Sequence, residues 1–178
     1  MYQAILTFWF DELEPADWWR RDSALDELIR QRFGQVHRQA AAGELWDWRT
    51  SAEGRLAEVI VLDQFSRNLF RDHPAAFAQD GMALVLAQEA IALGMDQALP
   101  VMQRSFLYMP FMHSESLAMH DRAVVLFDVP GMESSLDYER RHRDIIRRFG
   151  RYPHRNAVLG RESTPEERDF LAQPGSSF

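Results

Sequence analysis

The sequence contains no cysteine and no lysine. Without cysteine the chain can form no disulfide, offers no thiolate to a metal ion and has no cysteine nucleophile. All 20 basic residues are consequently arginine. The planar guanidinium group suits the recognition of carboxylate or phosphate, but a GC-rich coding sequence would give the same bias. We take the bias to be compositional, so it does not by itself indicate an anion-binding protein.

No apolar run approaches the roughly 20 residues that a membrane-spanning helix needs. The first residues, Met1–Ala4, lack the basic and long apolar regions of a secretory signal. A formal net charge of −7 disfavours general affinity for nucleic acid. We therefore expect a cytoplasmic protein with neither nucleic acid nor a membrane among its partners. The sequence does not indicate an oligomeric state.

What the sequence does contain is typical of a globular protein, since 46% of its 178 residues are hydrophobic and 26% are charged. This length suits one sizeable core, so we expect a single domain over residues 1–178. Apolar residues recur at helical spacing between glycine and proline breaks, and no segment alternates convincingly as a strand does. The predicted class is all-α, with helices of about 10–18 residues joined by short turns.

A buried central helix is predicted over Arg55–Phe70. Its apolar residues point in every direction around the helix, which is typical of a helix with no face toward solvent. Four strongly polar residues nevertheless lie on it, namely Asp63, Gln64, Arg67 and Asn68. Because a buried charge must be paired or otherwise satisfied, the rest of the chain has to supply partners for them.

Local signals mark several helix ends. Thr50 followed by Glu53 forms a capping-box pattern, which would open the central helix. Asp80 is placed to cap the helix that follows it. Pro110 should bend or end the helix in which it lies. The segment Thr164–Glu167 combines a cap residue, a proline at the first helical position and a glutamate at the third, which predicts a helix start there.

Polar residues gather in four clusters, the first of which is on the central helix. The others are His113–Glu115, Arg140–Asp144 and His154–Asn156. His113 and His154 both follow predicted helix breaks, and function concentrates at loop positions on a rigid frame. The candidates taken from these loops are His113, Glu115, His154, Arg155 and Asn156.

Two kinds of chemistry are disfavoured by the spacing of these residues. A metal site could combine Asp63, His113, Glu115 and His154, but the sequence has no HExxH pattern and no known ligand spacing. We therefore expect no metal and no cofactor. A serine nucleophile, either Ser66 or Ser114, lacks the G-x-S-x-G turn that would expose it.

An anion pocket needs no special spacing and is the best of the three candidate sites. Arginine binds carboxylate or phosphate through two parallel hydrogen bonds, and Arg67 and Arg155 could both contribute. The alternative of nearly equal weight is a buried hydrogen-bonded network that only fixes the packing of the helices.

Six strings of the sequence are specific when they are taken together. They are Leu62–Phe70, Tyr108–Glu115, Arg141–Ile146, Phe149–Asn156, Gly160–Glu167 and Pro174–Phe178. Together they resemble the bacterial family called domain of unknown function 924. The resemblance implies a tetratricopeptide-like stack of antiparallel helical hairpins around a central buried helix. It implies no established activity.

The resemblance also suggests a local feature of the central helix. Members of the family often carry proline where this chain has Ser66. Because proline bends a helix, we expect a kink or a helix end near Ser66, which would turn Arg67 and Asn68 toward a cleft.

The leading functional hypothesis is a binding protein for a small anionic ligand or an acidic peptide end. Arg67 and Arg155 would hold the anion, the two asparagines would orient it, and Asp63 would hold Arg67 in place. The ligand-binding candidates are thus Asp63, Gln64, Arg67, Asn68, Arg155 and Asn156.

Two alternatives remain open. The first is a hydrolase-type enzyme in the same cleft, with His113 or His154 as the general base and Glu115 as its orienting group. The second is a helical scaffold that binds partner proteins through its surface, which is an analogy from the fold alone.

Overall fold

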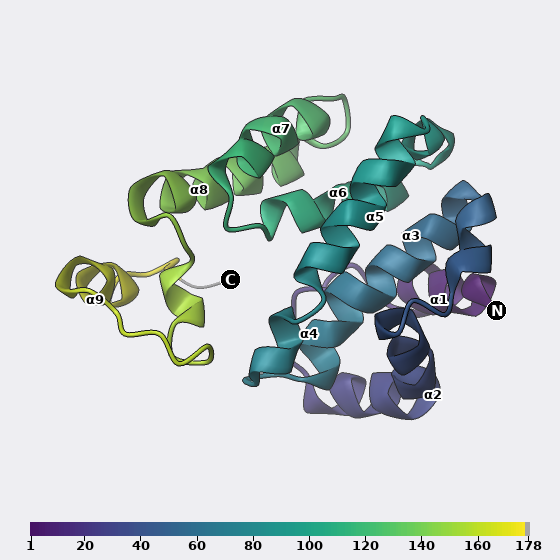
Figure 1. Cartoon of the computed structure of the whole chain (residues 1–178), viewed down its shortest axis with the longest axis horizontal. Helices are drawn as coiled ribbons and strands as arrows, with labels where there is room; N and C mark the ends of the chain where they lie inside the picture. The colour runs from purple at the N-terminus through teal and green to yellow at the C-terminus, as the bar shows by residue number, and fades with distance from the viewer. Residues whose placement is uncertain (177–178) are drawn as a thin grey trace.

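The computed structural model describes residues 1–176, and within them the chain folds into helices with no β-strand (Figure 1). The all-α prediction is confirmed, while the tetratricopeptide-like arrangement and the single-domain organisation stay predictions. The α-helices are α1 (Tyr2–Thr7), α2 (Ser23–Ala41), α3 (Ala52–Ile60), α4 (Ser66–Leu69), α5 (Asp80–Ala92), α6 (Val101–Met112), α7 (Leu117–Phe127), α8 (Glu133–Phe149) and α9 (Pro165–Leu171).

The helical segment made of α3 and α4 lies at the centre of the described chain. A π-helical turn over Val61–Phe65, which we label η3, joins the two helices without a break. Residues 54–66 are all buried, and α1, α5 and α6 pack against α3 while α2 packs against α4 (Figure 1). The prediction of a buried central helix is confirmed.

The start of α3 differs by one residue from the predicted capping box. Ser51, and not Thr50, is the cap, and its hydroxyl accepts a hydrogen bond of 3.1 Å from the backbone N–H of Gly54. A Cβ atom on Gly54 would lie 2.0 Å from the carbonyl oxygen of Trp48. Glycine is therefore required where the chain enters the central helix.

The chain does not end its helix at Ser66, whose backbone angles are helical (φ −57°, ψ −40°). A helix end at Ser66 is therefore wrong, while a kink there stays a prediction. The departure from α-helical geometry is the π-helical turn just before Ser66. The hydroxyl of Ser66 donates to the carbonyl of Leu62 over 2.6 Å and lies 2.8 Å from Nε2 of His37. π-Helical turns are rare and are frequently found at functional sites.

Three further local signals have different outcomes. The helix does not end at Pro110, which lies inside α6, so that part of the prediction is wrong, while a bend there stays a prediction. Asp80 makes no capping hydrogen bond, because α5 already begins at this residue and its carboxylate binds side chains elsewhere. Thr164 caps α9 in a complete capping box with Glu167.

The C-terminal helices form the other side of the structure. The α7 and α8 helices pack against each other, and together with α9 they lie to one side of α5 and α6 (Figure 1). A short 3-10 helix, η6 (Pro153–Arg155), lies between α8 and α9 in the chain. The segment from η6 to Leu159 lies opposite the N-terminal end of α5, and the candidate site lies between them. Of the ending Pro174–Phe178, the last two residues lie outside the described range.

Candidate functional site

The site is built around the carboxylate of Asp63, which lies in the π-helical turn η3 with no solvent exposure. Nε2 of Gln64 donates to its Oδ2 over 2.5 Å, and Nδ1 of His113 lies 2.7 Å from its Oδ1. Burial alone would raise the pKa of Asp63, but the charges of His113 and Arg67 and these hydrogen bonds lower it to about 2. Asp63 is therefore ionised at neutral pH.

His113 follows the last residue of α6 and binds Asp63 with only one of its ring nitrogens. An ionised carboxylate can only accept hydrogen bonds, so Nδ1 of His113 carries the proton between them. In the neutral form of the ring, Nε2 would be a hydrogen-bond acceptor, and it has no hydrogen-bond partner within residues 1–176. The His113 side chain is 20% exposed.

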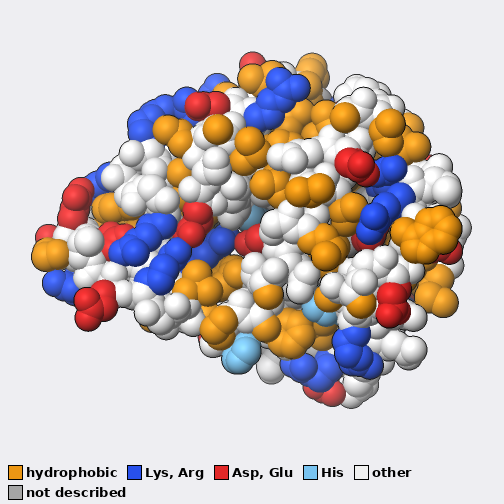
Figure 2. Space-filling view, viewed as in Figure 1, with side chains coloured by type: hydrophobic (Ala, Val, Ile, Leu, Met, Phe, Trp, Pro, Cys, Tyr) orange, Lys and Arg blue, Asp and Glu red, His pale blue; other side chains and the backbone are white. Residues whose placement is uncertain are grey.

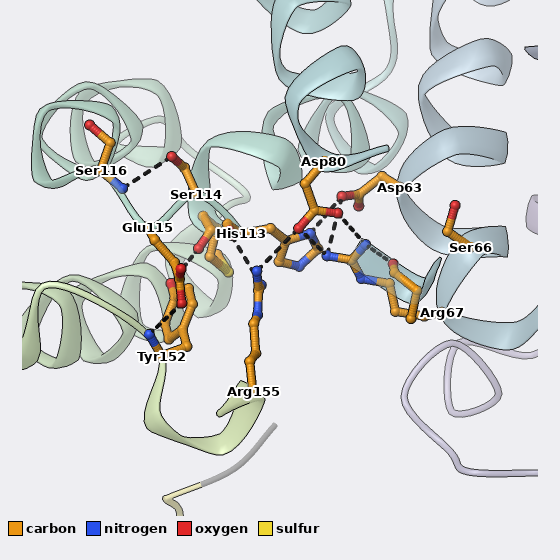
Figure 3. Close-up of polar contacts among 12 residues, drawn as sticks. Asp63, Ser66, Arg67, Asp80, His113, Ser114, Glu115, Ser116, Tyr152 and Arg155 are labelled. Carbon is orange, nitrogen blue, oxygen red and sulfur yellow. Dashed lines mark hydrogen bonds and ion pairs between the residues drawn. The ribbon is translucent and has the colours of Figure 1, made fainter. Parts of the chain in front are cut away.

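Two arginines converge on Asp80, at the start of α5 (Figure 3). Arg67 binds both oxygens of its carboxylate, with Nη2 at 3.0 Å from Oδ2, and also donates to the carbonyl of Ala76 over 2.7 Å. Nη1 of Arg155 donates to the same Oδ2 over 3.1 Å. The guanidinium group of Arg155 lies 4.5 Å from the ring centre of Phe77.

These contacts close into a ring of alternating charges. Arg67 lies 4.0 Å from Asp63 and binds Asp80, which in turn binds Arg155. Arg155 donates to the backbone carbonyl of His113 over 3.0 Å, and the side chain of His113 returns to Asp63. The ring joins the central helix, α5, the end of α6 and η6, so it fixes the position of His113 from both its backbone and its side chain (Figure 3).

A pocket of about 360 Å³ opens beside this ring. Figure 2 shows a hollow between the part of the chain that carries α8 and α9 and the part that carries α5, with acidic, basic and histidine atoms inside it. Its volume lies at the lower end of the range for small-molecule sites. The polar side chains that line it are Asp80, His113, Ser114, Glu115 and Arg155, and the larger apolar ones are Pro74, Phe77, Leu84, Pro110 and Leu159.

The low pKa of Asp63 predicts an acid-sensitive contribution to stability. Because the pKa is lower in the folded state than in the unfolded chain, the contribution is present above pH 4 and is lost as the pH falls toward 2. We expect the difference in free energy of unfolding between the wild type and Asp63→Asn to shrink by about 2 kcal/mol over that interval. Denaturant unfolding at several pH values measures it, and a difference that stays constant with pH would contradict the ionised state of Asp63.

The structure brings Asp63, Gln64, Arg67, His113 and Arg155 together. Glu115 also lines the pocket, but it does not bind His113. Its carboxylate accepts two hydrogen bonds from Arg161, of 2.7 and 2.8 Å, and one of 2.8 Å from the backbone N–H of Tyr152. The carboxylate that orients His113 is Asp63.

The structure places the remaining candidates elsewhere. Asn68 donates to Asp26 of α2 over 2.8 Å, and neither residue lines the pocket. Asn156 is buried and binds Arg161, Ser163 and Glu167.

His154 does not line the pocket. Its ring centre lies 5.5 Å from that of Tyr152, and burial lowers the pKa of its imidazole to about 4.

Reasoning from the sequence missed Asp80, which joins the two arginines. An acidic residue at a helix start has a sufficient local explanation as a cap, so its sequence position gave no signal of a distant partner. Sequence reasoning also missed Phe77, which lines the pocket and stacks on Arg155. A lone aromatic residue in a turn carries no signal of such a role.

Residues 1–176 also bear on two other classes of site. No group of three or more histidine, aspartate or glutamate side chains in this range is arranged to hold a metal ion. None of the helices in the same range is long and apolar enough to span a membrane.

Comparison with known proteins identifies the family. Residues 5–175 match the family described as "Bacterial protein of unknown function (DUF924)". A solved structure of a protein of unknown function from Agrobacterium tumefaciens, ATU0120, is 42% identical, and the alignment covers 96% of each chain with a TM-score of 0.91. A search of curated proteins finds no match. Because the family match extends over nearly the whole chain, this protein belongs to that bacterial family of unknown function.

Proposed function

We propose that this protein is a small-molecule hydrolase in which Asp63 and His113 form a general-base pair. The observation that carries the proposal is that the two nitrogens of the His113 ring have different surroundings. Nδ1 is held at 2.7 Å by a buried, ionised carboxylate, while Nε2 has no protein partner within residues 1–176 and the residue lines a pocket. Such an arrangement leaves a basic nitrogen available to a bound ligand or water.

In this proposal water is the nucleophile. Nε2 of His113 takes a proton from water as the water oxygen bonds to an acyl carbon, and Asp63 stabilises the imidazolium that forms. The proton then passes to the leaving oxygen or nitrogen as its bond to the acyl carbon breaks. Neither serine considered as a nucleophile binds His113, since Ser66 is buried and donates to Leu62, and the hydroxyl of Ser114 accepts from the N–H of Ser116.

The charges around the pocket favour an uncharged substrate. Asp63 and Asp80 together offset the charges of Arg67 and Arg155, and Arg161 offsets that of Glu115. The apolar lining suits an acyl or alkyl group, and the pocket volume limits the substrate to a small molecule. Small neutral esters and amides are therefore the substrate class proposed.

The same charges weigh against the anion-binding hypothesis. An anionic ligand would have to displace Asp80 from both arginines, or bind where their charge is already neutralised. Asn68 and Asn156, which were expected to orient the anion, bind other residues.

The test is a screen of small chromogenic esters and amides with the wild type, His113→Ala and the control His73→Ala, which replaces an exposed turn histidine. General-base catalysis contributes roughly 10²- to 10⁴-fold to a rate, so His113→Ala should lose hydrolysis by that factor while the control retains it. Equal hydrolysis by His113→Ala would refute the proposal. Thermal stabilisation by phosphate or carboxylates, without any hydrolysis, would favour the anion-binding hypothesis instead.

A further inference from the structure

A second pair of polar residues lies behind the wall of the same pocket. His120 of α7 and Glu139 of α8 are both completely buried, and Nδ1 of His120 lies 2.7 Å from Oε1 of Glu139. Neither residue lines the pocket. His120, however, contacts the loop that does line the pocket, through the carbonyl of Ser114.

The protons of His120 can be located from its neighbours. Its Nε2 lies 2.8 Å from the backbone carbonyl oxygen of Ser114, which can only accept, so Nε2 must carry a proton. The hydroxyl of Tyr152, 3.2 Å from the same nitrogen, donates its own proton to the carbonyl of Met112 over 2.5 Å. A further proton must lie between Nδ1 and Glu139, because two lone pairs would repel each other at 2.7 Å.

The surroundings of Glu139 decide on which side that proton lies. Its second oxygen, Oε2, is buried and has no hydrogen-bond partner within residues 1–176. An ionised carboxylate with one unpaired oxygen in a completely buried place is far more costly than a neutral carboxyl group. The charged or titratable groups nearest Glu139 include His120 itself, His113 after α6 and Arg143 on its own helix. They lower the pKa of Glu139, but burial outweighs them and the pKa is raised.

We infer that Glu139 is a neutral carboxylic acid at physiological pH, that it donates its proton to Nδ1 of His120, and that the pair positions the Ser114 carbonyl on the pocket wall. His120 and Glu139 are thus positioning residues for the loop that carries His113 and Glu115. This role rests on the proposed function only in treating the pocket as the active site. The protonation state itself does not depend on any substrate.

Successive residues of this loop are each held by a different element, which explains why the pair matters. Arg155 binds the carbonyl of His113, His120 binds that of Ser114, and the N–H of Tyr152 binds the side chain of Glu115. Removing the contact between His120 and the Ser114 carbonyl would therefore free the segment between His113 and Glu115.

Two matched variants test the inference without any substrate. In Glu139→Gln the amide N–H can donate to Nδ1 in place of the carboxylic acid, whereas Glu139→Ala leaves His120 without that donor. We expect Glu139→Gln to keep the wild-type midpoint of thermal unfolding and the wild-type exchange of the Tyr152 amide. We expect Glu139→Ala to exchange that amide roughly 10- to 100-fold faster, as the loss of one buried hydrogen bond predicts.

Infrared difference spectra of the wild type and Glu139→Gln at neutral pH give an independent readout. The inference predicts that the variant loses a carboxylic-acid C=O band. A loss of carboxylate bands instead, or a Glu139→Gln variant as impaired as Glu139→Ala, would overturn it, because the residue would then be an anion paired with a charged His120. Failure of every hydrolysis screen would leave these results unaffected.

Discussion

Replacing Arg67 by alanine is expected to lower the free energy of unfolding by about 3–5 kcal/mol, the cost of breaking a buried ion pair by removing one partner. Arg67 binds both oxygens of Asp80, donates to the Ala76 carbonyl and lies 4.0 Å from Asp63. Its removal leaves the completely buried Asp63 without a neighbouring cation other than a protonated His113. It also leaves Asp80 with Arg155 alone.

Denaturant unfolding of purified protein measures this loss, and Arg147→Ala is the matched control. Arg147 pairs with Asp144 on α8, but both side chains are more than half exposed. Exposed pairs of this kind contribute about 1 kcal/mol or less. A loss for Arg67→Ala no greater than that of the control would contradict the buried ring of charges.

The second large effect is expected on the hydrolysis that we propose for this protein. Asp63→Asn should reduce the rate of hydrolysis by roughly 10²- to 10⁴-fold while leaving the pocket lining in place. An asparagine amide can donate to Nδ1 of His113, which would move the ring proton to Nε2. Nε2, the nitrogen that we propose as the general base, would then carry a proton and could no longer accept one.

Gln64→Leu is the control for this variant. Gln64 donates to the other oxygen of Asp63 and contacts Met109, so its loss disturbs the same carboxylate but leaves the bond to His113 in place. We expect its rate to stay within about threefold of the wild type, since Asp63 stays ionised at neutral pH. Equal losses in the two variants would show that the site responds to general disruption and not to the ring tautomer.

The sequence was sufficient to predict the central buried helix and its need for partners. A helix that is apolar all round can only be buried, and Asp63 on such a helix must be paired. It could not predict that the partner is His113, 50 residues away, because no local rule connects two side chains that meet only when α6 packs on the central helix. Asn68 shows the same limit, since only the packing of α2 assigns it to Asp26.

Local sequence rules for helix ends also gave wrong predictions where a residue had two possible roles. Asp80 has the features of a helix cap, yet its carboxylate is used by two arginines from distant segments. Pro110 has the features of a helix breaker, yet α6 continues through it. By contrast, the capping box at Thr164 depends only on residues within one helical turn, and there the sequence was sufficient.

The tautomer of His113 is the measurement that tests the proposed general-base site most directly. Spectra of protein labelled with ¹⁵N in its histidines distinguish a protonated ring nitrogen from an unprotonated one, and His113→Gln identifies the relevant signals. At a pH where the ring is neutral, we expect a proton on Nδ1 and none on Nε2 in the wild type. In Asp63→Asn we expect the reverse. A proton on Nε2 in the wild type would contradict it, because His113 could then not act as the base toward a molecule in the pocket.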